Sequence, residues 1–301
     1  MSNARNILIF GPTGAVGSAA ALTAHQEGAQ VTFAMRDPTK PIPSLDHISA
    51  KRIQADLSDP GSVYAAAIQS GAKVAFLYAL FDTSDHMRAT IEALKTGGIE
   101  FVVLLSSVTV KGNIRAVPTS EYIGYTHAQI EVSLDEVFGR ENFVAVRPYF
   151  FTSNILWFKD GIVSGEVKHA NPDAAFDWIS PEDIGRVAGQ LLAHGSRENV
   201  VYLSGPEQMS LREALVVVSR VLGKEIRATK ISRPEAFQLM VANGTPGPLA
   251  NNVMDDLTEH PGEDLKFTLS INAVDNIQRY TNRVPIRFHE WMEVNKHKFE
   301  A

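Results

Sequence analysis

The stretch that decides the fold stands near the start of the chain: Asn6-Ile7-Leu8-Ile9-Phe10-Gly11-Pro12-Thr13-Gly14-Ala15-Val16-Gly17. A short apolar run ends in three glycines at G-x-x-G-x-x-G spacing, and an alanine-rich segment follows from Ser18 to Glu27. The pattern predicts a strand, a glycine turn and a helix, an arrangement that places a pyrophosphate at the helix N-terminus. Unpaired backbone N–H groups and the positive end of the helix dipole meet the phosphates there. We therefore expect a dinucleotide-binding turn.

The first half of the chain alternates strand-like and helix-like segments. Strands are expected at 6–10, 30–35, 50–54, 73–78, 101–105 and 143–147. Helices are expected at about 15–27, 60–70, 84–96 and 121–138. Because strands that alternate with helices pair in parallel, we predict an α/β fold with a doubly wound parallel sheet of the Rossmann type. Its ligand site would lie beyond the carboxyl ends of the strands.

The pattern loosens after Pro148. A capped helix is expected from Ser180 to about His194, a strand at 200–203, and a capping box at 210–213 opens a helix that Gly223 closes. The clearest loop is 242–250, and helical patterns resume at 251–259, 271–280 and 287–298. We expect a dinucleotide-binding domain over 1–155, with 180–203 returning to it, and a smaller, mainly helical C-terminal lobe over 156–301 that binds substrate or caps the sheet.

Composition excludes several classes of function. The 301 residues are 45% hydrophobic and 21% charged, without a run long enough to span a membrane and without a charged-then-apolar leader. The absence of cysteine removes disulfides, thiolate catalysis and cysteine-bound zinc. A net charge of −6 without a basic stripe argues against a nucleic-acid partner. We expect a cytoplasmic monomer or homodimer with a small-molecule substrate.

The end of the second predicted strand carries Arg36 and Asp37, where such folds bind the adenosine ribose. A carboxylate there favours NAD, whereas a guanidinium pairs with a 2′-phosphate and favours NADP. Because Arg36 comes first, we expect NADP, with NAD the less favoured alternative, and we interpret Asp37 as a turn residue. Asp56 and Leu57, after the third strand, either contact the adenine or belong only to the turn at 58–60.

Two serines, Ser106 and Ser107, end the fifth predicted strand. Hydroxyls at this edge of a sheet suit polarising a carbonyl or contacting the nicotinamide ribose. The alternative is that serine is simply common where strands end.

The predicted helix at 121–138 carries Tyr125 and Gln129, which are four residues apart and share one face. A tyrosine can give a substrate oxygen its proton, and a lysine one turn later would lower the phenol's pKa and hold the ribose. Gln129 stands in the lysine's place; it can bind a ribose but supplies no charge. His127 points elsewhere on the helix, and we expect an exposed side chain there, with a role as an alternative acid less favoured.

Aromatic side chains are dense after the sixth predicted strand. We expect about half of them to pack in the core and the rest to line a substrate pocket between sheet and lobe: Tyr149, Phe150, Phe151, Trp157, Phe158, Phe176 and Trp178. The expected substrate contacts are Tyr149, Phe151, Asn154, Trp178 and His169.

A metal-like spacing occurs at His289, Glu293 and His297. Without a fourth ligand, and with lysines at 296 and 298, the pattern is typical of a solvated terminal helix. No metal is expected.

Several motifs occur together along the chain: the glycine turn at 11–17, Arg36, the Ser-Ser strand tip, Arg147-Pro148-Tyr149-Phe150-Phe151 with Asn154, Trp178-Ile179-Ser180-Pro181-Glu182-Asp183-Ile184-Gly185, and Val201-Tyr202-Leu203-Ser204-Gly205-Pro206 followed by Ser210. In this order and spacing they resemble the NmrA-like family of atypical short-chain dehydrogenases/reductases. The resemblance runs from about residue 5 to 295. It departs from the family at Gln129, where a lysine is frequent.

The resemblance implies a bound dinucleotide, and the family includes reductases of small quinones, imines and phenylpropanoid compounds as well as redox sensors that regulate partners. The expected cofactor contacts are Gly11, Thr13, Gly14, Ala15, Val16, Gly17, Arg36, Asp56, Leu57, Leu77, Tyr78, Ser106, Ser107, Tyr149, Phe150 and Phe151, with Tyr125 and Gln129 as catalytic residues.

Two functions follow, and the first is favoured. One is an NADP(H)-dependent reductase of a small carbonyl, quinone or imine compound that lacks the usual lysine. The other is a noncatalytic NAD(P)-binding redox sensor that acts through a protein partner and uses an exposed loop such as 242–250. A redox-neutral isomerase or cyclase stays open, without a residue that argues for it.

Overall fold

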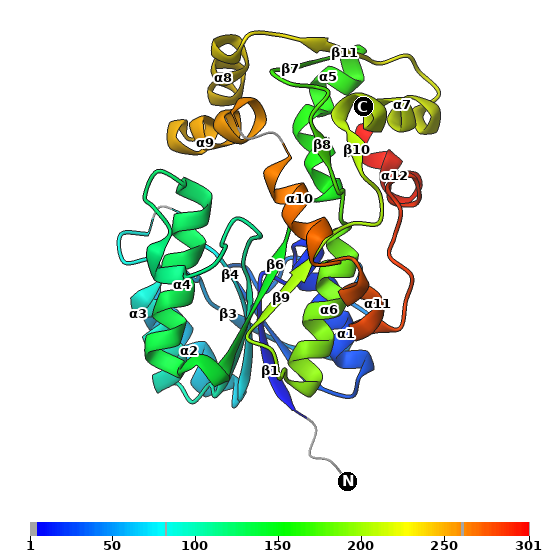
Figure 1. Ribbon diagram of the computed structural model, residues 1–301. Coiled ribbons are helices and arrows are strands. Elements are labelled where there is room, and N and C mark those ends of the chain that lie inside the picture. The colour runs from blue at the N-terminus through cyan, green and yellow to red at the C-terminus, as the bar shows by residue number, and fades with distance from the viewer. Residues whose placement is uncertain (1–4, 82, 260–261, 301) are drawn as a thin grey trace.

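Seven parallel strands form the central sheet of the computed structural model, which describes residues 5–300 except 82, 260 and 261 (Figure 1). The strands lie in the order β3-β2-β1-β4-β5-β6-β9. Their bounds are β1 Asn6–Phe10, β2 Gln30–Met35, β3 Lys51–Gln54, β4 Val74–Tyr78, β5 Phe101–Leu105, β6 Phe143–Pro148 and β9 Val200–Leu203. The chain runs outward from β1 to β3 and then returns to β4 on the other side of β1. This confirms the predicted doubly wound, Rossmann-type sheet, whose switch point lies between β1 and β4.

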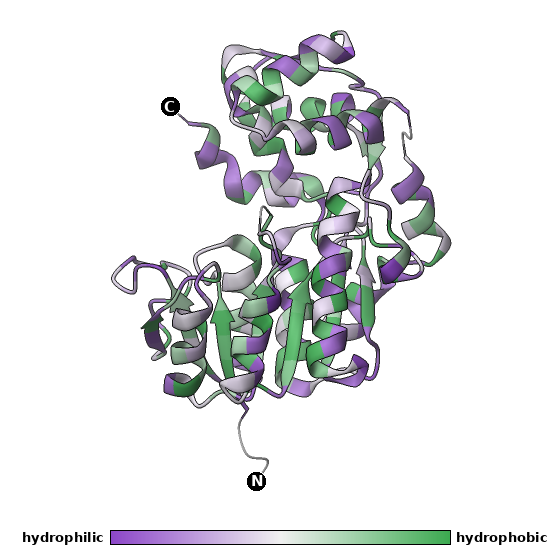
Figure 2. Cartoon of the chain, turned by 90° about the vertical axis from the view of Figure 1, so that its left-hand side faces the viewer, coloured by the Kyte–Doolittle hydropathy of each residue, from purple (hydrophilic) through white to green (hydrophobic). Residues whose placement is uncertain are grey.

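Helices cover both faces of the sheet. One face packs against α1 (Ala15–Gln26), α6 (Pro181–His194) and α11 (Asp275–Thr281), and the other against α2 (Pro60–Ser70), α3 (Arg88–Thr96) and α4 (Tyr122–Phe138). Since the middle of the sheet is buried on both sides, the inner strands β1, β4, β5 and β6 are nearly continuous apolar runs, coloured green in Figure 2, whereas the edge strand β3 is polar.

The helix boundaries follow from the residues that satisfy the helix ends. The side chain of Asp59 accepts from the Gly61 N–H at the start of α2, and Gly71 ends that helix with φ +63. At α6 the side chain of Ser180 accepts from the Asp183 N–H at 3.0 Å. Each polar cap satisfies an N–H group that the first turn of a helix leaves without a partner.

The remaining elements form a lobe over the carboxyl ends of the strands (Figure 1). Its core gathers around Trp178, Phe288 and Trp291. The lobe elements are η3 Thr152–Phe158, α5 Lys159–Ser164, β7 Glu166–His169, β8 Ala175–Phe176, β10 Met209–Ser210, α7 Leu211–Leu222, β11 Arg227–Lys230, α8 Arg233–Ala242, α9 Gly247–Thr258, α10 Glu263–Ser270, α12 Phe288–Asn295 and η4 Lys296–Phe299. Between β8 and β10 the chain leaves the lobe, adds α6 and β9 to the sheet, and comes back. Short 3-10 turns η1 (Ile114–Ala116) and η2 (Arg140–Asn142) flank α4. None of the helices in the described part of the chain is both long and apolar enough to span a bilayer.

Three expected boundaries were wrong. The helix expected at 84–96 begins only at Arg88, because His86 and Met87 adopt left-handed backbone conformations. The helix expected at 271–280 begins only at Asp275, as α11, because the chain turns between α10 and α11, where Asn272 has φ +50.

The loop expected at 242–250 is shorter than predicted. The helix α8 reaches Ala242 and α9 already begins at Gly247. Pro248 stands in the first turn of α9, where proline starts a helix rather than breaking it.

Candidate active site

The glycine turn has the geometry of a phosphate cradle. Gly11 has φ +66, and Gly14 is the N-cap of α1 without any side-chain cap, so the first N–H groups of α1 remain available to a ligand. A Cβ at Gly11 would lie 2.7 Å from Cε1 of Tyr78. A Cβ at Gly17 would overlap the carbonyl oxygen of Gly11 and lie 2.9 Å from its carbon. Thr13 is exposed in the same turn. These residues fit a bound dinucleotide.

The expected adenosine end brings residues from three strands into electrostatic range. Arg36 is exposed after β2. Hydrogen bonds from Ser58 lower the pKa of the Asp56 carboxyl, and the charge of Arg36 lowers it further. Burial raises the pKa of Tyr78, while the Arg36 charge opposes that rise. The Arg36 guanidinium therefore lies within electrostatic range of Tyr78, whose ring covers Gly11.

The two carboxylates of this region are engaged in turns. Asp37 Oδ1 accepts from the N–H and hydroxyl of Thr39, at 2.9 and 2.6 Å. Asp56 Oδ1 accepts from the N–H of Ser58 at 3.0 Å and from its hydroxyl at 2.8 Å. This geometry favours the turn interpretation of both residues.

Some expected cofactor contacts are core residues. The side chains of Leu57 and Leu77 are buried under the sheet on the α2–α4 face, and that of Val16 is buried on the opposite face. Their side chains cannot reach a ligand, which corrects the prediction for them; only their backbone atoms, and the exposed Ala15, could do so.

The two serines that follow β5 have different surroundings. Ser106 is buried and donates to Oε1 of Glu131 at 2.7 Å, so the expectation that its hydroxyl meets the cofactor was wrong. Ser107 is half-buried, and its oxygen accepts from the hydroxyl of Thr109 at 2.9 Å. No hydrogen bond in the described residues uses the Ser107 O–H as donor, so this hydroxyl can still donate to a ligand.

Glu131 belongs to a buried ion pair that sequence reasoning missed. Arg147 donates from Nε to Oε1 at 2.9 Å and from Nη2 to Oε2 at 2.6 Å, and both side chains are at most 2% exposed. Nη1 of Arg147 also donates to the Val110 carbonyl at 2.7 Å and to the Tyr202 hydroxyl at 2.8 Å. Burial opposes the charge of Arg147, but Glu131 and then Tyr202 outweigh it and raise its pKa. The pair joins α4, the segment after β5, β6 and β9 directly behind the carboxyl edge.

Tyr125 and Gln129 lie half-buried on one face of α4, as the spacing predicts. The Tyr125 hydroxyl and the Gln129 amide make no hydrogen bond to other described residues, so both are open to a ligand. His86, from the loop after β4, meets the ring of Tyr125 edge-on with 5.5 Å between ring centroids.

His127 is not the exposed side chain expected. It is 8% exposed, packs edge-on against Phe81, and its Nδ1 has no hydrogen-bond partner in the described structure. Burial, and then the charge of Arg147, lowers the pKa of His127 to about 4. A neutral imidazole that cannot reach solvent is unsuited to the alternative-acid role.

The segment after β6 carries the aromatic candidates. Tyr149, Phe150, Phe151 and Asn154 are half-buried there. Burial raises the pKa of Tyr149, and the carboxylates of Asp264, Asp177 and Asp256 add to that rise.

Trp178 and His169 are corrections. The indole of Trp178 is fully buried and donates to the Met209 carbonyl at 2.8 Å, so it holds the lobe together rather than touching substrate. His169 lies buried in β7 against Phe158, and burial lowers its pKa to about 4. Both residues lie inside the lobe core because the chain doubles back through β7 and β8.

Helices of the lobe reach the same edge of the sheet. The Asn252 side chain accepts from the Ile123 N–H at 2.9 Å, which caps the first turn of α4 from α9. Lys111 forms an ion pair with Asp264 of α10. No pattern in the sequence marks these long-range contacts, whereas a lone arginine in the apolar strand β6 is a signal that a buried acidic partner such as Glu131 exists.

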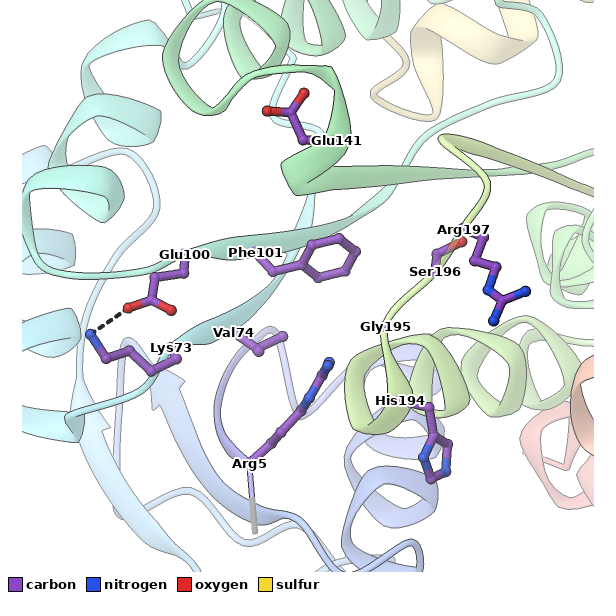
Figure 3. A pocket seen from close by; sticks show the side chains of 10 residues that line it. All are labelled: Arg5, Lys73, Val74, Glu100, Phe101, Glu141, His194, Gly195, Ser196 and Arg197. Carbon is purple, nitrogen blue, oxygen red and sulfur yellow. Dashed lines mark ion pairs between the residues drawn. The ribbon is translucent and has the colours of Figure 1, made fainter. Parts of the chain in front are cut away.

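A cavity of about 540 Å³ lies at the opposite, amino edge of the sheet (Figure 3). Arg5, Arg197 and His194 line it, together with the Lys73–Glu100 ion pair. Because dinucleotides bind at the carboxyl edge of such sheets, this cavity is separate from the candidate active site.

Two residues of the metal-like spacing in the terminal helix, Glu293 and His297, contact nearby residues of the same helix or the turn after it. Glu293 pairs with Lys296 at 3.2 Å, and His297 Nδ1 lies 3.2 Å from the Val294 carbonyl. In residues 5–300 outside the gaps, no three potential metal ligands are grouped.

The sheet and the glycine turn define a protein with the Rossmann-type fold, and its sequence matches the NmrA-like family over residues 3–260. The chain belongs to this family. It is 34% identical to the nitrogen metabolite regulation-like protein bik4 of Gibberella fujikuroi over 95% of each chain.

Solved structures with the same fold include an NADPH-dependent quinone oxidoreductase from Escherichia coli, complexed with NADPH. Its TM-score is 0.74 at 19% identity, with 98% of this chain and 100% of that chain covered. NmrA, a negative transcriptional regulator, gives a TM-score of 0.72 at 16% identity, with 99% and 98% covered. The fold is thus shared by a reductase and a regulator.

Proposed function

We propose that this protein is an NADP(H)-dependent reductase of small carbonyl, quinone or imine compounds. The observation that carries the proposal is that the glycine turn, Arg36 and the Tyr125 phenol lie at the same carboxyl edge, and that this phenol makes no hydrogen bond to another described residue. The quinone oxidoreductase of the same fold, which was solved with NADPH, supports it.

The residues have separate roles in this proposal. Bound at the glycine turn, the reduced dinucleotide supplies a hydride for an electrophilic carbon. Arg36 pairs with the 2′-phosphate, and Gln129 binds a ribose hydroxyl without contributing a charge. Tyr125 holds on its phenol oxygen the proton that the substrate's oxygen or nitrogen receives, and the Ser107 hydroxyl donates to the cofactor amide. Tyr149 and Phe151 contribute apolar surface to the substrate.

The cofactor part is tested by calorimetric titration with NADP⁺, NADPH, NAD⁺ and NADH. We expect tight NADPH binding and a clear margin over NADH. Arg36→Ala should weaken the binding of NADPH by about tenfold or more and leave the binding of NADH nearly unchanged, because it removes a charged hydrogen bond to the 2′-phosphate. Arg197→Ala, an exposed arginine at the opposite edge, is the matched control. Equal losses for both cofactors would mean that Arg36 does not meet the 2′-phosphate.

The reaction part is tested by NADPH oxidation with a panel of aldehydes, quinones and cyclic iminium compounds. Turnover with a member of the panel, lost in Tyr125→Phe for the carbonyl substrates, is the expected result. Absence of oxidation across the panel, despite tight NADPH binding, would reject the reductase.

A second candidate is a noncatalytic redox sensor, and Gln129 in place of lysine favours it. The regulatory names of bik4 and of NmrA are consistent with such a role. The segment that contacts the protein partner would be the short α8–α9 connection at 243–246. Partner capture that differs between the NADP⁺-loaded and NADPH-loaded protein would support the sensor, and capture indifferent to redox state would reject it.

A further inference from the structure

The turn before α3 holds two consecutive non-glycine residues in the left-handed region. His86 has φ +49 and Met87 has φ +63. Such conformations cost free energy and persist only where surrounding contacts fix them. Here the Met87 N–H donates to Oγ1 of Thr83 at 3.2 Å and Oδ1 of Asp85 at 3.1 Å, and the Met87 side chain is buried. The backbone of this turn is therefore firmly held.

This turn lies along the first two turns of α4, which carry Tyr125. The rings of Phe81 and Tyr122 are 5.8 Å apart, and those of Phe81 and His127 are 5.5 Å apart. Between Tyr122 and His127 on α4, Tyr125 meets His86, with 5.5 Å between ring centroids and an angle of 87° between the ring planes. Three aromatic contacts thus clamp the loop after β4 onto α4.

Among the described residues, the charged neighbours of His86 in the sequence, Asp85 and Arg88, both have hydrogen-bond partners. Asp85 accepts from the N–H groups of Met87 and Ala89. Arg88 donates to Glu92 at 2.7 Å and to Glu136 at 2.5 Å. The His86 ring is left to pack against Tyr125.

We propose that His86 is a positioning residue for Tyr125: its ring packs against the phenol ring and holds it in one orientation. The inference rests on the proposed reductase function. The contact acts through ring packing, so it needs an aromatic ring at position 86 rather than a proton on it. The strained backbone fixes the place of that ring relative to β4, and through β4 relative to the glycine turn.

Three substitutions separate this role from that of a simple turn residue. His86→Asn tolerates the left-handed backbone but removes the ring. His86→Phe keeps the ring and removes the imidazole nitrogens. Ser84→Ala, with an exposed side chain in the same loop, is the control.

We expect His86→Asn to keep the thermal midpoint and NADPH affinity of the wild type but to lose about tenfold or more in kcat, with KM within about twofold. His86→Phe should recover most of that kcat, and Ser84→Ala should match the wild type. If His86→Asn is as active as the wild type, His86 is only a turn residue. If His86→Phe is as poor as His86→Asn, the imidazole's chemistry and not its packing matters, and the proposal is overturned.

A second readout does not depend on turnover. The protein is labelled with 3-fluorotyrosine, and the signal that disappears in Tyr125→Phe is followed by fluorine NMR in the NADP⁺-saturated protein. His86→Asn should shift this signal and narrow it as the ring gains freedom, while His86→Phe should leave one broad, wild-type-like signal. An unchanged signal in His86→Asn refutes the contact even if no substrate is found, whereas the altered signal without any turnover would count against the reductase alone.

Discussion

At the scale of single residues, neighbouring atoms leave no room for a side chain at Gly11 and Gly17 of the glycine turn. Gly11 needs a left-handed backbone, and Gly17 lies against the carbonyl group of Gly11. The spacing of the glycines predicted the turn itself, and the structure adds these two constraints. The spacing did not predict that Tyr78 would cover Gly11, because that contact depends on how β4 pairs with β1.

Gly17→Ala is expected to disrupt this turn. The new methyl group overlaps the Gly11 carbonyl, so the strand and helix must separate at a cost of about 1–3 kcal/mol. NADPH affinity should fall with it, because the phosphate-facing N–H groups move. Urea unfolding and calorimetric titration measure the two effects, with Gly247→Ala, which has open space around it, as control. Wild-type stability and affinity in Gly17→Ala would show that the turn can relax without cost.

At the scale of elements, the buried Arg147–Glu131 pair ties α4 to three strands. Arg147 was part of a family-like motif in the sequence, whereas no role was predicted for Glu131 on a helix interpreted through Tyr125, His127 and Gln129. The same pair explains why Ser106 was misplaced: its hydroxyl is needed inside, as a donor to Glu131. A strand-end serine cannot be assigned to a ligand before the facing helix is known.

Glu131→Leu should cost about 3–5 kcal/mol, because it leaves the guanidinium of Arg147 buried and unpaired. The double variant Glu131→Leu/Arg147→Met should lose less free energy of unfolding than the two single variants lose together, because neither buried charge remains in it. Urea unfolding of the four proteins gives the coupling energy. Strictly additive losses would indicate that the two side chains do not stabilise each other.

At the scale of the whole molecule, strand and helix order was predicted for most of the sheet, whereas the lobe was not. Helices of the sheet region have local signals, such as the Asp59 cap and Gly71. Lobe residues such as Trp178 and His169 are placed by contacts between segments far apart in the chain, so they were assigned to a substrate surface that they do not reach. The sequence pattern also does not distinguish which of the half-buried aromatic residues contacts a ligand.

Acid should unfold the protein partly through His127. Its pKa is about 4 in the folded protein and about 6.5 when unfolded, so between these values only the unfolded chain binds the proton. Folding stability from this residue is complete above about pH 6.5 and falls as the pH decreases, by about 2 kcal/mol at pH 5. Between pH 7.5 and pH 5, the free energy of unfolding measured in urea should therefore fall by about 2 kcal/mol less in His127→Leu than in the wild type. Asp177, whose raised pKa acts in the opposite sense, is present in both proteins. Parallel pH profiles would contradict the burial of a neutral His127.

The excursion of the chain through the lobe between β6 and β9 has a consequence for biosynthesis. All six residues of β6 are buried in the finished sheet, but the strand that covers its outer edge follows only about fifty residues later. At ribosomal speeds of about 5–20 residues per second, this edge waits for several seconds. During that interval the nascent chain presents an open, apolar β-edge, which is a natural place for a chaperone to bind and for two unfinished chains to aggregate.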